Sequence, residues 1–246
     1  MKKVLQAILQ RLLGFERYLT FFSRFKIMTL RWDGQQKEGD FNFFLTLLKP
    51  ESRVLDIGAN IGIMTVLMAK RCKQGQVFAF EPVPENFDAL DKVVASYRLQ
   101  NVLLFPLALG AKVDTVSMTM PVLKGVRMQG LAHVQHQTIE GYEAPQIGYE
   151  VKQLPLDEVC ELKGKKIDAI KIDVENYEQF VLEGAHKLLS TDRPIIYCEL
   201  WDNENRQRCF EILGELKYKT RVLVNQQLED YDPAIHSHHN FFFIPS

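Results

Sequence analysis

Apolar and polar residues follow two different rhythms along this chain. From residue 40 onward, short runs of apolar residues predict buried strands, and longer stretches with apolar residues three or four apart predict helices between them. The predicted strands are 53–57, 76–80, 102–107, 167–172, 194–200, 218–224 and 240–244. Strands that alternate with helices indicate an α/β fold: a doubly wound, mostly parallel seven-stranded sheet whose last strand is made antiparallel by a final hairpin.

One predicted helix, 41–48, precedes the first strand, and the others, 63–72, 84–98, 177–189 and 203–216, each follow a strand. The segment 113–156 interrupts the alternation. Residues 113–120 and 148–154 have the pattern of two exposed strands that pair, with several glycines and polar residues between them. We interpret 113–156 as a hairpin or flap with a mobile tip, inserted into a domain that spans 51–246.

Residues 1–50 are predicted to form an N-terminal helical appendage. Its first 31 residues are rich in Leu and Phe, and polar residues recur every seven positions at Lys3, Gln10, Arg17 and Arg24. This spacing indicates one or two amphipathic helices with a break near Gly14. Charges interrupt the segment too often for a transmembrane span, and a signal peptide is not expected because a continuous apolar run and a cleavage site are lacking.

Charge is distributed unevenly. The whole chain carries −1, but residues 1–31 carry +6, so the other 215 residues carry −7. Two interpretations of the basic segment stay open: packing on the domain or on a second subunit, or a peripheral membrane contact. We favour packing, since Phe15, Leu19, Phe22 and Phe25 would suit a buried seam. The negative main domain argues against a nucleic-acid partner.

The cysteines bear on the compartment. Four are present, at Cys72, Cys160, Cys198 and Cys209, and they form no C-x-x-C pair. They are typical of reduced thiols rather than of a disulfide framework or a zinc site. We therefore expect a cytoplasmic protein, with membrane association as an open possibility.

The first candidate chemistry lies where strand 53–57 meets the next helix, at Asp56-x-Gly58-x-Asn60-x-Gly62. Glycines at such a turn let the backbone approach a ligand, and the helix start offers free N–H groups. An acid before the first glycine would repel a pyrophosphate but would suit an ammonium group or hydroxyls. We therefore predict S-adenosylmethionine as the cofactor rather than NAD or ATP; a dehydrogenase would also need G-x-G-x-x-G.

Acidic residues also end three other strands. Glu81 follows strand 76–80 and is placed to bind ribose hydroxyls. Asp173 and Glu175 follow strand 167–172, and Glu199 ends strand 194–200. The last three should share one crevice, and we take them as candidate catalytic groups because a cluster of acids must bind a cation, a proton or hydroxyls. Glu175 could instead cap a helix, and His133 could act as a base if the flap closes.

Together these motifs resemble a known family. DIGANIG, AFEP with PENF, LALG, IKIDVEN and a late strand ending in Glu are similar to the FkbM-like methyltransferases, which typically contain DVGANIG, FEPNPENF, NLALG and KIDVEG. The resemblance covers residues 53–201. It implies a class I, Rossmann-like SAM-dependent O-methyltransferase that acts on hydroxyls of sugars, glycolipids or polyketides. Asn176 replaces the glycine that the family commonly has.

The resemblance also implies roles for individual residues. Asp56, Gly58 and Gly62 would hold the methionine part of the cofactor, with Asn60 at the turn. Glu81 would bind the ribose, Pro82 and Asn86 would border the adenine, and Ala108 to Gly110 would form the far wall of its slot. Asp173 and Glu175 would face the methyl group and a small-molecule or carbohydrate acceptor.

Several alternatives stay open. A divalent metal held by the acids could activate the acceptor, although no spacing requires it. A catalytically silent domain that docks through residues 1–31, or a homodimer, is also compatible with the sequence. Nucleic-acid or amide acceptors are less favoured, since no NPPY-like tetrapeptide follows the fourth strand.

Overall fold

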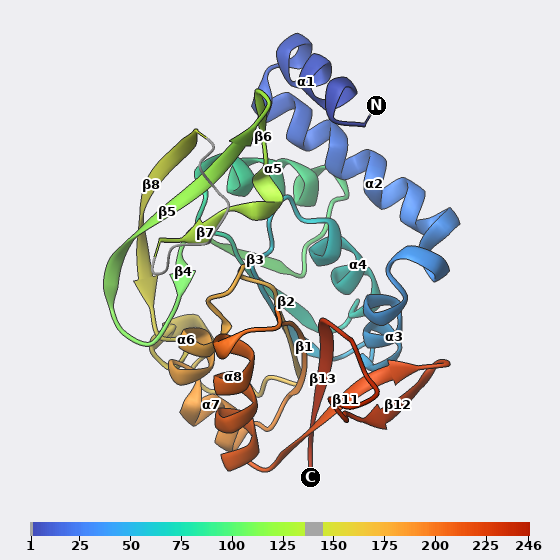
Figure 1. The fold of residues 1–246 in the computed structure, drawn as a ribbon, viewed down its shortest axis with the longest axis vertical. Helices are drawn as coiled ribbons and strands as arrows, with labels where there is room; N and C mark the ends of the chain where they lie inside the picture. The colour runs from blue at the N-terminus through green and yellow to red at the C-terminus, as the bar shows by residue number, and fades with distance from the viewer. Residues whose placement is uncertain (1, 136–144) are drawn as a thin grey trace.

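The structure is a computed structural model that describes residues 2–135 and 145–246. Its centre is an eight-stranded sheet in the order β12-β11-β13-β10-β9-β1-β2-β3 (Figure 1). The strands are β1 (Arg53–Ile57), β2 (Gln76–Phe80), β3 (Val102–Phe105), β9 (Ala169–Ile172), β10 (Ile195–Glu199), β11 (Tyr218–Val224), β12 (Gln227–Asp230) and β13 (Asn240–Pro245). The strands β3, β2, β1, β9 and β10 are parallel, and β13 runs antiparallel between β10 and β11. The predicted seven strands are confirmed, and β12 is an additional edge strand that the sequence did not suggest.

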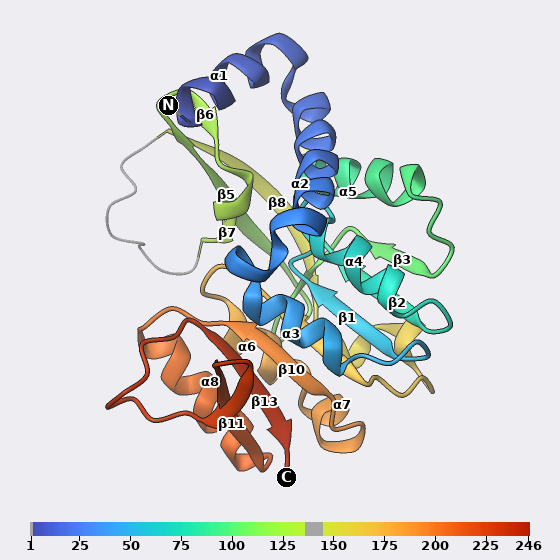
Figure 2. The ribbon, with the colours of Figure 1, turned by 90° about the vertical axis from the view of Figure 1, so that its right-hand side faces the viewer.

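Helices cover both faces of this sheet (Figure 2). They are α3 (Gly39–Leu47), α4 (Ile63–Arg71), α5 (Pro84–Ser96), α6 (Glu178–Glu183), α7 (His186–Thr191) and α8 (Glu204–Glu215). One face packs on α3, α4 and α5 through residues such as Val54 and Ala79, and the other packs on α6, α7 and α8 through residues such as Leu55 and Ile170. Burial on both faces explains why the strands are continuous apolar runs.

The helix predicted over 177–189 is in fact two helices, α6 and α7. They are separated at Gly184, where an added Cβ would lie 2.0 Å from the carbonyl oxygen of Gly110. The carboxylate of Asp157 then accepts hydrogen bonds from the first backbone N–H groups of α7, at Lys187 (2.8 Å) and Leu188 (2.9 Å). The prediction was wrong because a tertiary contact, and not the local apolar pattern, ends the first helix.

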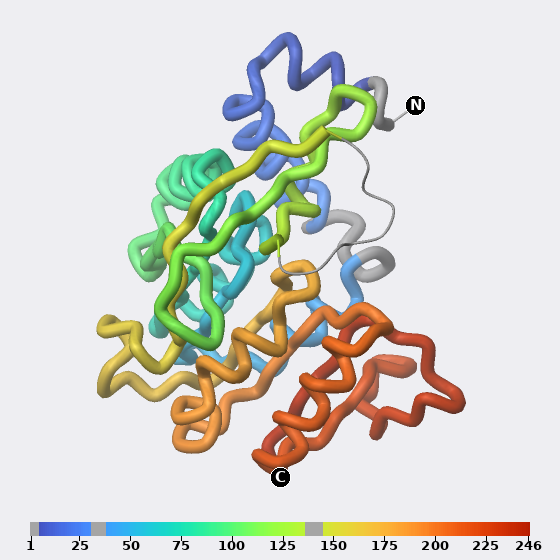
Figure 3. The backbone as a smooth tube through the Cα atoms, turned by 60° about the vertical axis from the view of Figure 1, so that its left-hand side comes forward, coloured from blue at the N-terminus to red at the C-terminus, as the bar shows by residue number. Residues whose placement is uncertain are grey.

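A second, smaller sheet is formed by the inserted segment, 113–156, together with the short strand that precedes it. Its strands are β4 (Ala108–Leu109), β5 (Asp114–Leu123), β6 (Val126–Arg127), β7 (His133–Val134) and β8 (Gln146–Leu154), with three short 3₁₀ turns at η1 (Gln129–Leu131), η2 (Leu156–Glu158) and η3 (Cys160–Leu162). β5 and β8 pair antiparallel, as predicted, from Asp114–Gln153 to Pro121–Gln146. This long hairpin extends beside the N-terminal helices (Figure 3). Residues 136–144, which belong to the stretch where a mobile tip was expected, lie outside the described residues.

The N-terminal segment forms α1 (Lys2–Leu13) and α2 (Phe15–Lys37), separated at Gly14, which has φ 76°. α2 packs on the helices that cover the sheet, with Leu19 buried against Ile61 and Ala89, and Ile27 buried against α4 and α5. The hydroxyl of Ser23 donates a hydrogen bond to the carbonyl of Ile61 (2.7 Å). Packing on the domain is thus observed, while the proposed domain boundary at residue 50 stays a prediction.

The buried seam of α2 differs from the predicted one. Leu19 is fully buried and Phe22 is half-buried, but Phe25 is 49% exposed and stacks on Phe21. The buried positions are instead Leu19, Ser23 and Ile27, which are four residues apart. The reason is helical geometry: with 3.6 residues per turn, a spacing of four and the expected spacing of three rotate in opposite directions around the helix, so the expected row turns away from the domain.

Candidate functional site

The register of the central sheet brings the carboxyl ends of three strands to the same level. Ile57 of β1 pairs with Phe80 of β2 on one side and with Ile172 of β9 on the other. The residues that follow, Gly58 and Asp173, are joined to this edge by backbone hydrogen bonds from Gly58 N to Phe80 O (3.1 Å) and from Asp173 N to Ile57 O (3.1 Å). The ends of β1, β2 and β9 therefore form one wall of a crevice, the usual ligand site of an open α/β sheet.

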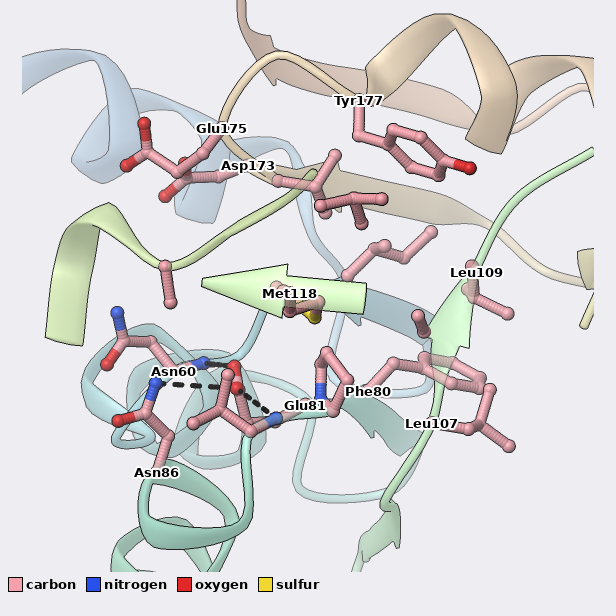
Figure 4. Close-up of a pocket in the computed structure, with 18 of the residues that line it drawn as sticks. Asn60, Phe80, Glu81, Asn86, Leu107, Leu109, Met118, Asp173, Glu175 and Tyr177 are labelled. Atoms are coloured by element: carbon pink, nitrogen blue, oxygen red, sulfur yellow. Dashed lines mark hydrogen bonds between the residues drawn. The ribbon is translucent and has the colours of Figure 1, made fainter. Parts of the chain in front are cut away.

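A pocket lies at this edge (Figure 4). The predicted site residues that line it are Gly58, Asn60, Glu81, Pro82, Asn86, Ala108, Asp173 and Glu175. Apolar side chains line another part of it, among them Phe80, Leu107, Leu109 and Met118. In Figure 4 the acids Asp173 and Glu175 lie together, apart from Glu81, Asn60 and Asn86. The pocket thus has two polar ends and an apolar wall.

The glycine turn requires its first glycine. Gly58 has φ 76°, and a Cβ added there would lie 1.9 Å from the carbonyl oxygen of Asp173. Asn60 also has a left-handed backbone, with φ 49°, which asparagine tolerates better than most residues. The turn therefore passes directly against the end of β9 and presents its backbone to the pocket.

Glu81 is held by the turn that it faces. Its carboxylate accepts hydrogen bonds from the backbone N–H of Asn60 (2.8 Å) and Val83 (2.9 Å) and from the amide of Asn86 (3.4 Å). Burial raises the pKa of Glu81 to about 7, against the opposing effect of these hydrogen bonds. A carboxylate has about four lone-pair sites, so one remains for a ligand hydroxyl.

Two amide oxygens beside Glu81 are buried and find no hydrogen-bond partner among the described residues: Oδ1 of Asn60 and Oδ1 of Asn86. The amide nitrogens of both side chains instead lie at the carbonyl of Gln129 (3.4 and 3.5 Å), which covers this end of the pocket from η1. Unsatisfied acceptors next to a carboxylate suit a ligand rich in donors, such as hydroxyl and amino groups.

The acids at the other end disfavour one another's ionisation. Burial, with the charges of Asp173 and Glu199, raises the pKa of Glu175 to about 9. Partial desolvation and the charge of Asp173 raise the pKa of Glu199 to about 7, although this side chain at the end of β10 is still exposed. Glu199 does not line the pocket itself but is electrostatically coupled to the acids that do.

Asp56 lies beneath the turn rather than in the pocket lining. It is fully buried, accepts a hydrogen bond from Thr65, and is 3.3 Å from the ammonium group of Lys171. Lys171 also donates to the carbonyl of Gly58 (2.7 Å) and lies 3.7 Å from Asp173. Burial alone would lower the pKa of Lys171, but the two carboxylates outweigh it and hold the pKa above its usual value.

Comparison with known proteins identifies the family. The sequence model of the methyltransferase FkbM domain matches residues 56–235, well over half of the chain. The chain belongs to the FkbM methyltransferase family. The expected resemblance and the cofactor of this class, S-adenosylmethionine, are thereby confirmed.

Curated relatives agree with the FkbM assignment. "Methyltransferase 1" of Beauveria bassiana is 26% identical over 147 residues, and "Methyltransferase sdnD" of Sordaria araneosa is 29% identical over 158 residues. Each match covers 54% of this chain, and the matched part spans only 58% and 60% of the two relatives.

Solved structures support the fold. An FkbM methyltransferase from Methylobacillus flagellatus KT superposes with a TM-score of 0.53 at 16% identity, over 80% of this chain and 44% of that chain. A precorrin-6y C5,15-methyltransferase from Geobacter metallireducens GS-15 gives 0.50 at 12% identity, over 85% and 87% of the two chains. At these identities the likeness concerns the fold alone, and it confirms the class I, Rossmann-like architecture.

At position 176 this chain has asparagine where FkbM proteins commonly have glycine, and the local backbone explains why asparagine fits there. Asn176 has φ 72° and the preceding Glu175 has φ 53°, so two successive residues are left-handed. Glycine or asparagine meets this requirement with little strain. The turn is held by Glu178, whose carboxylate accepts from the backbone N–H of Val174 (3.3 Å) and Asn176 (3.2 Å) and from the amide of Asn205 (2.6 Å).

Sequence reasoning assigned no role to Lys171 or Glu178. A charged residue within an otherwise apolar strand, as in IKI, was the available signal for Lys171, because a buried lysine needs a partner. Glu178 gave no such signal, since an acid at the start of a helix is normally exposed. Both residues support the site without lining it.

Besides Asp56, four residues considered in the sequence lie outside the pocket lining. Gly62 begins α4, and a Cβ there would meet Leu90. Gly110 packs against the side chain of Gln153. His133 is buried within the flap, close to the hydroxyl of Thr119 (3.2 Å), and Glu199 is exposed at the end of β10.

Metal ligation was left open by the sequence. Within residues 2–135 and 145–246, no group of three or more His, Cys, Asp or Glu side chains is arranged to hold a metal ion. We derive no step through a metal.

Proposed function

We propose that this FkbM-family chain transfers a methyl group from S-adenosylmethionine to a hydroxyl oxygen of a small molecule, of the sugar, glycolipid or polyketide-like kind. The observation that carries the proposal is the two-ended pocket. Glu81, with the unsatisfied oxygens of Asn60 and Asn86, forms one end, and the acids Asp173 and Glu175 form the other.

The residues at the Glu81 end would hold the cofactor. Glu81 would accept hydrogen bonds from ribose hydroxyls, and Asn60 and Asn86 offer further acceptors beside it. The apolar wall at Phe80 and Leu107 would pack against the flat adenine ring. When bound, S-adenosylmethionine supplies a methyl group on a positively charged sulfur, so the C–S bond breaks with its electron pair left on sulfur as the acceptor oxygen forms its new bond to carbon.

The acids would handle the proton that the acceptor hydroxyl loses. Glu199, with a pKa of about 7, is close to the ideal for a general base at neutral pH. Asp173 lines the pocket, and its charge contributes to the raised pKa of Glu199. We therefore infer that the proton passes to the pair Asp173 and Glu199.

Glu175 would have a different role. With a pKa of about 9 it carries a proton at neutral pH, so it can donate a hydrogen bond but cannot accept the acceptor's proton. It would orient a hydroxyl acceptor, and alignment is the main contribution that a methyltransferase makes.

The test combines cofactor binding with turnover. Glu81→Gln should weaken binding of S-adenosylmethionine by roughly 5- to 150-fold in a calorimetric titration, the loss of a hydrogen-bonded partner worth about 1–3 kcal/mol. On a panel of sugars, glycolipids, phenols and amines, Asp173→Asn and Glu199→Gln should lower turnover by about 10²- to 10⁴-fold while the cofactor still binds. The exposed Glu215→Gln serves as the matched control.

Two outcomes would contradict the proposal. Unchanged cofactor affinity in Glu81→Gln would place the ribose elsewhere. Methylation of amines but of no hydroxyl compound on the panel would make the chain an N-methyltransferase.

A further inference from the structure

Exposed apolar side chains are concentrated on the N-terminal helices. Of the nine large apolar side chains that are exposed in the described part of the chain, seven lie on α1 or α2. Those on α1 are Leu5, Ile8, Leu12 and Leu13, and those on α2 are Phe21, Phe25 and Met28. Leu12 is 75% exposed and Met28 is 54% exposed. Clustered exposed apolar groups are typical of interaction surfaces.

On α2 these apolar groups line a surface groove with basic rims. The groove lies between α2 and α5 and includes Phe21, Phe25 and Met28 together with Arg17, Arg24 and Lys92. Phe21 and Phe25 stack on one another, with ring centroids 6.4 Å apart. Glu16 is the only acid in the lining, and it lies 3.7 Å from Lys92.

A contact between α1 and the flap places the N-terminal helices relative to the pocket. α1 lies at one end of the molecule, and α2 runs from there along its side towards α3 (Figures 1 and 2). The side chain of Gln10 on α1 exchanges two hydrogen bonds with the backbone of Arg127 on the flap (3.2 and 3.1 Å). Two residues further along, Gln129 covers the Glu81 end of the pocket. Helix α1 therefore adjoins the part of the flap that covers the pocket.

We propose that the outer faces of α1 and α2 dock on an anionic membrane surface. The apolar side chains would enter the interface, and the basic residues would contact the lipid headgroups. None of the described helices is long and apolar enough to cross a membrane. The contact that we propose is a peripheral one, made by side chains at the surface of α1 and α2.

Charge favours a membrane over a second copy of the chain. Residues 1–31 carry +6, and the other 215 residues carry −7. A twofold dimer through this surface would place two such basic segments against each other, because the same patch meets itself in such an interface. An anionic bilayer instead attracts the segment and repels the acidic remainder, which also fixes the orientation.

The experiment is co-sedimentation of the full chain with vesicles. Vesicles of phosphatidylcholine mixed with phosphatidylglycerol should bind the chain at about 0.1 M salt but weakly at about 1 M salt, where screening is nearly complete. Phosphatidylcholine alone should bind weakly. Arg17→Gln with Arg24→Gln should weaken binding about 30-fold, from roughly fivefold for each basic residue near the surface. Phe21→Ser with Phe25→Ser should weaken binding to the same vesicles at both salt concentrations.

Matched controls separate the surface from general effects. Lys73→Gln with Lys219→Gln removes the same charge from exposed sites elsewhere, and Val113→Ser with Ile235→Ser removes exposed apolar groups elsewhere. Neither pair should change binding. Failure of the unmodified chain to bind the anionic vesicles, or equal loss in the controls, would overturn the proposal. A dimer in sedimentation analysis that Phe21→Ser with Phe25→Ser dissociates would assign the surface to a second copy instead.

Discussion

Two carboxyl groups, Glu175 in the pocket lining and Glu199 coupled to it, ionise less readily in the folded chain than in water. Glu175 and Glu199 both have raised pKa values because desolvation and neighbouring charge disfavour the anions. Each unit of pKa shift corresponds to about 1.36 kcal/mol between the two protonation states. The proposed acceptor end of the site therefore reduces the stability of the fold at neutral and alkaline pH.

Replacing Glu175 should make this pH-dependent loss of stability measurable. Its pKa is near 4.5 when unfolded and about 9 when folded, so the folded chain binds the proton more tightly. The stability that this proton provides is complete below pH 4.5 and is lost as the pH rises towards 9. Glu175→Gln removes that dependence, and we expect it to be about 1–3 kcal/mol more stable than the parent near pH 8, with little difference near pH 4.

Denaturant unfolding at several pH values measures this difference. Glu215→Gln, at an exposed site, is the control and should be neutral at every pH. A Glu175→Gln chain that is equally or less stable than the parent near pH 8 would show that Glu175 is not held protonated.

At the scale of elements, the turn from β1 to α4 is fixed by its contact with the end of β9. Gly58 has no room for a side chain there, because Asp173 lies against it, and Lys171 ties the two strand ends together. The turn and the acidic end of the pocket are therefore one structural unit.

The change Gly58→Ala should disrupt both parts of this unit. The added Cβ would lie 1.9 Å from a backbone oxygen, and φ 76° is unfavourable for alanine, so we expect a loss of more than about 2 kcal/mol in stability. Binding of S-adenosylmethionine, followed by calorimetry, should be lost at a temperature where the variant is still folded.

Gly214→Ala is the control for that change. Gly214 lies in α8 with nothing within 4 Å of an added Cβ, so alanine there should stabilise by about 1 kcal/mol. Normal cofactor binding by Gly58→Ala would mean that the turn can move away from β9 without consequence for the site.

Over the whole molecule, the N-terminal helices are part of the support of the site. Leu19 is fully buried against Ile61, which belongs to the glycine turn, and Ser23 bonds the carbonyl of the same residue. α2 therefore packs against the outer side of the glycine turn, and the inner side of the same turn lines the pocket. The appendage contributes to the core in addition to presenting the surface described above.

This bracing predicts a contrast between two positions on α2. Leu19→Ala should lower the free energy of unfolding by about 2–5 kcal/mol, because it leaves a cavity beneath the turn. Phe21→Ala, on the exposed face, should change it by less than about 0.5 kcal/mol. Chemical denaturation measures both free energies of unfolding. If Leu19→Ala changed the free energy of unfolding as little as Phe21→Ala, α2 would be packed only loosely on the domain.

The sequence by itself determined the features that depend on short stretches of chain. Apolar runs specified the strands of the central sheet, and the positions of Glu81, Asp173 and Glu199 at strand ends followed directly. Parallel strands end at one edge, so the crevice could be placed without coordinates. The break at Gly14 was also local, since glycine readily takes the left-handed backbone found there.

Only the tertiary structure decided which side chains meet. The contact of Lys171 with Gly58 joins residues 113 apart in sequence, and that of Gln10 with Arg127 joins residues 117 apart. The end of α6 at Gly184 and the exposure of Phe25 likewise depend on what packs against each helix. Periodicity specifies which face of an element is apolar, but the partner of that face is set by the packing of the complete fold.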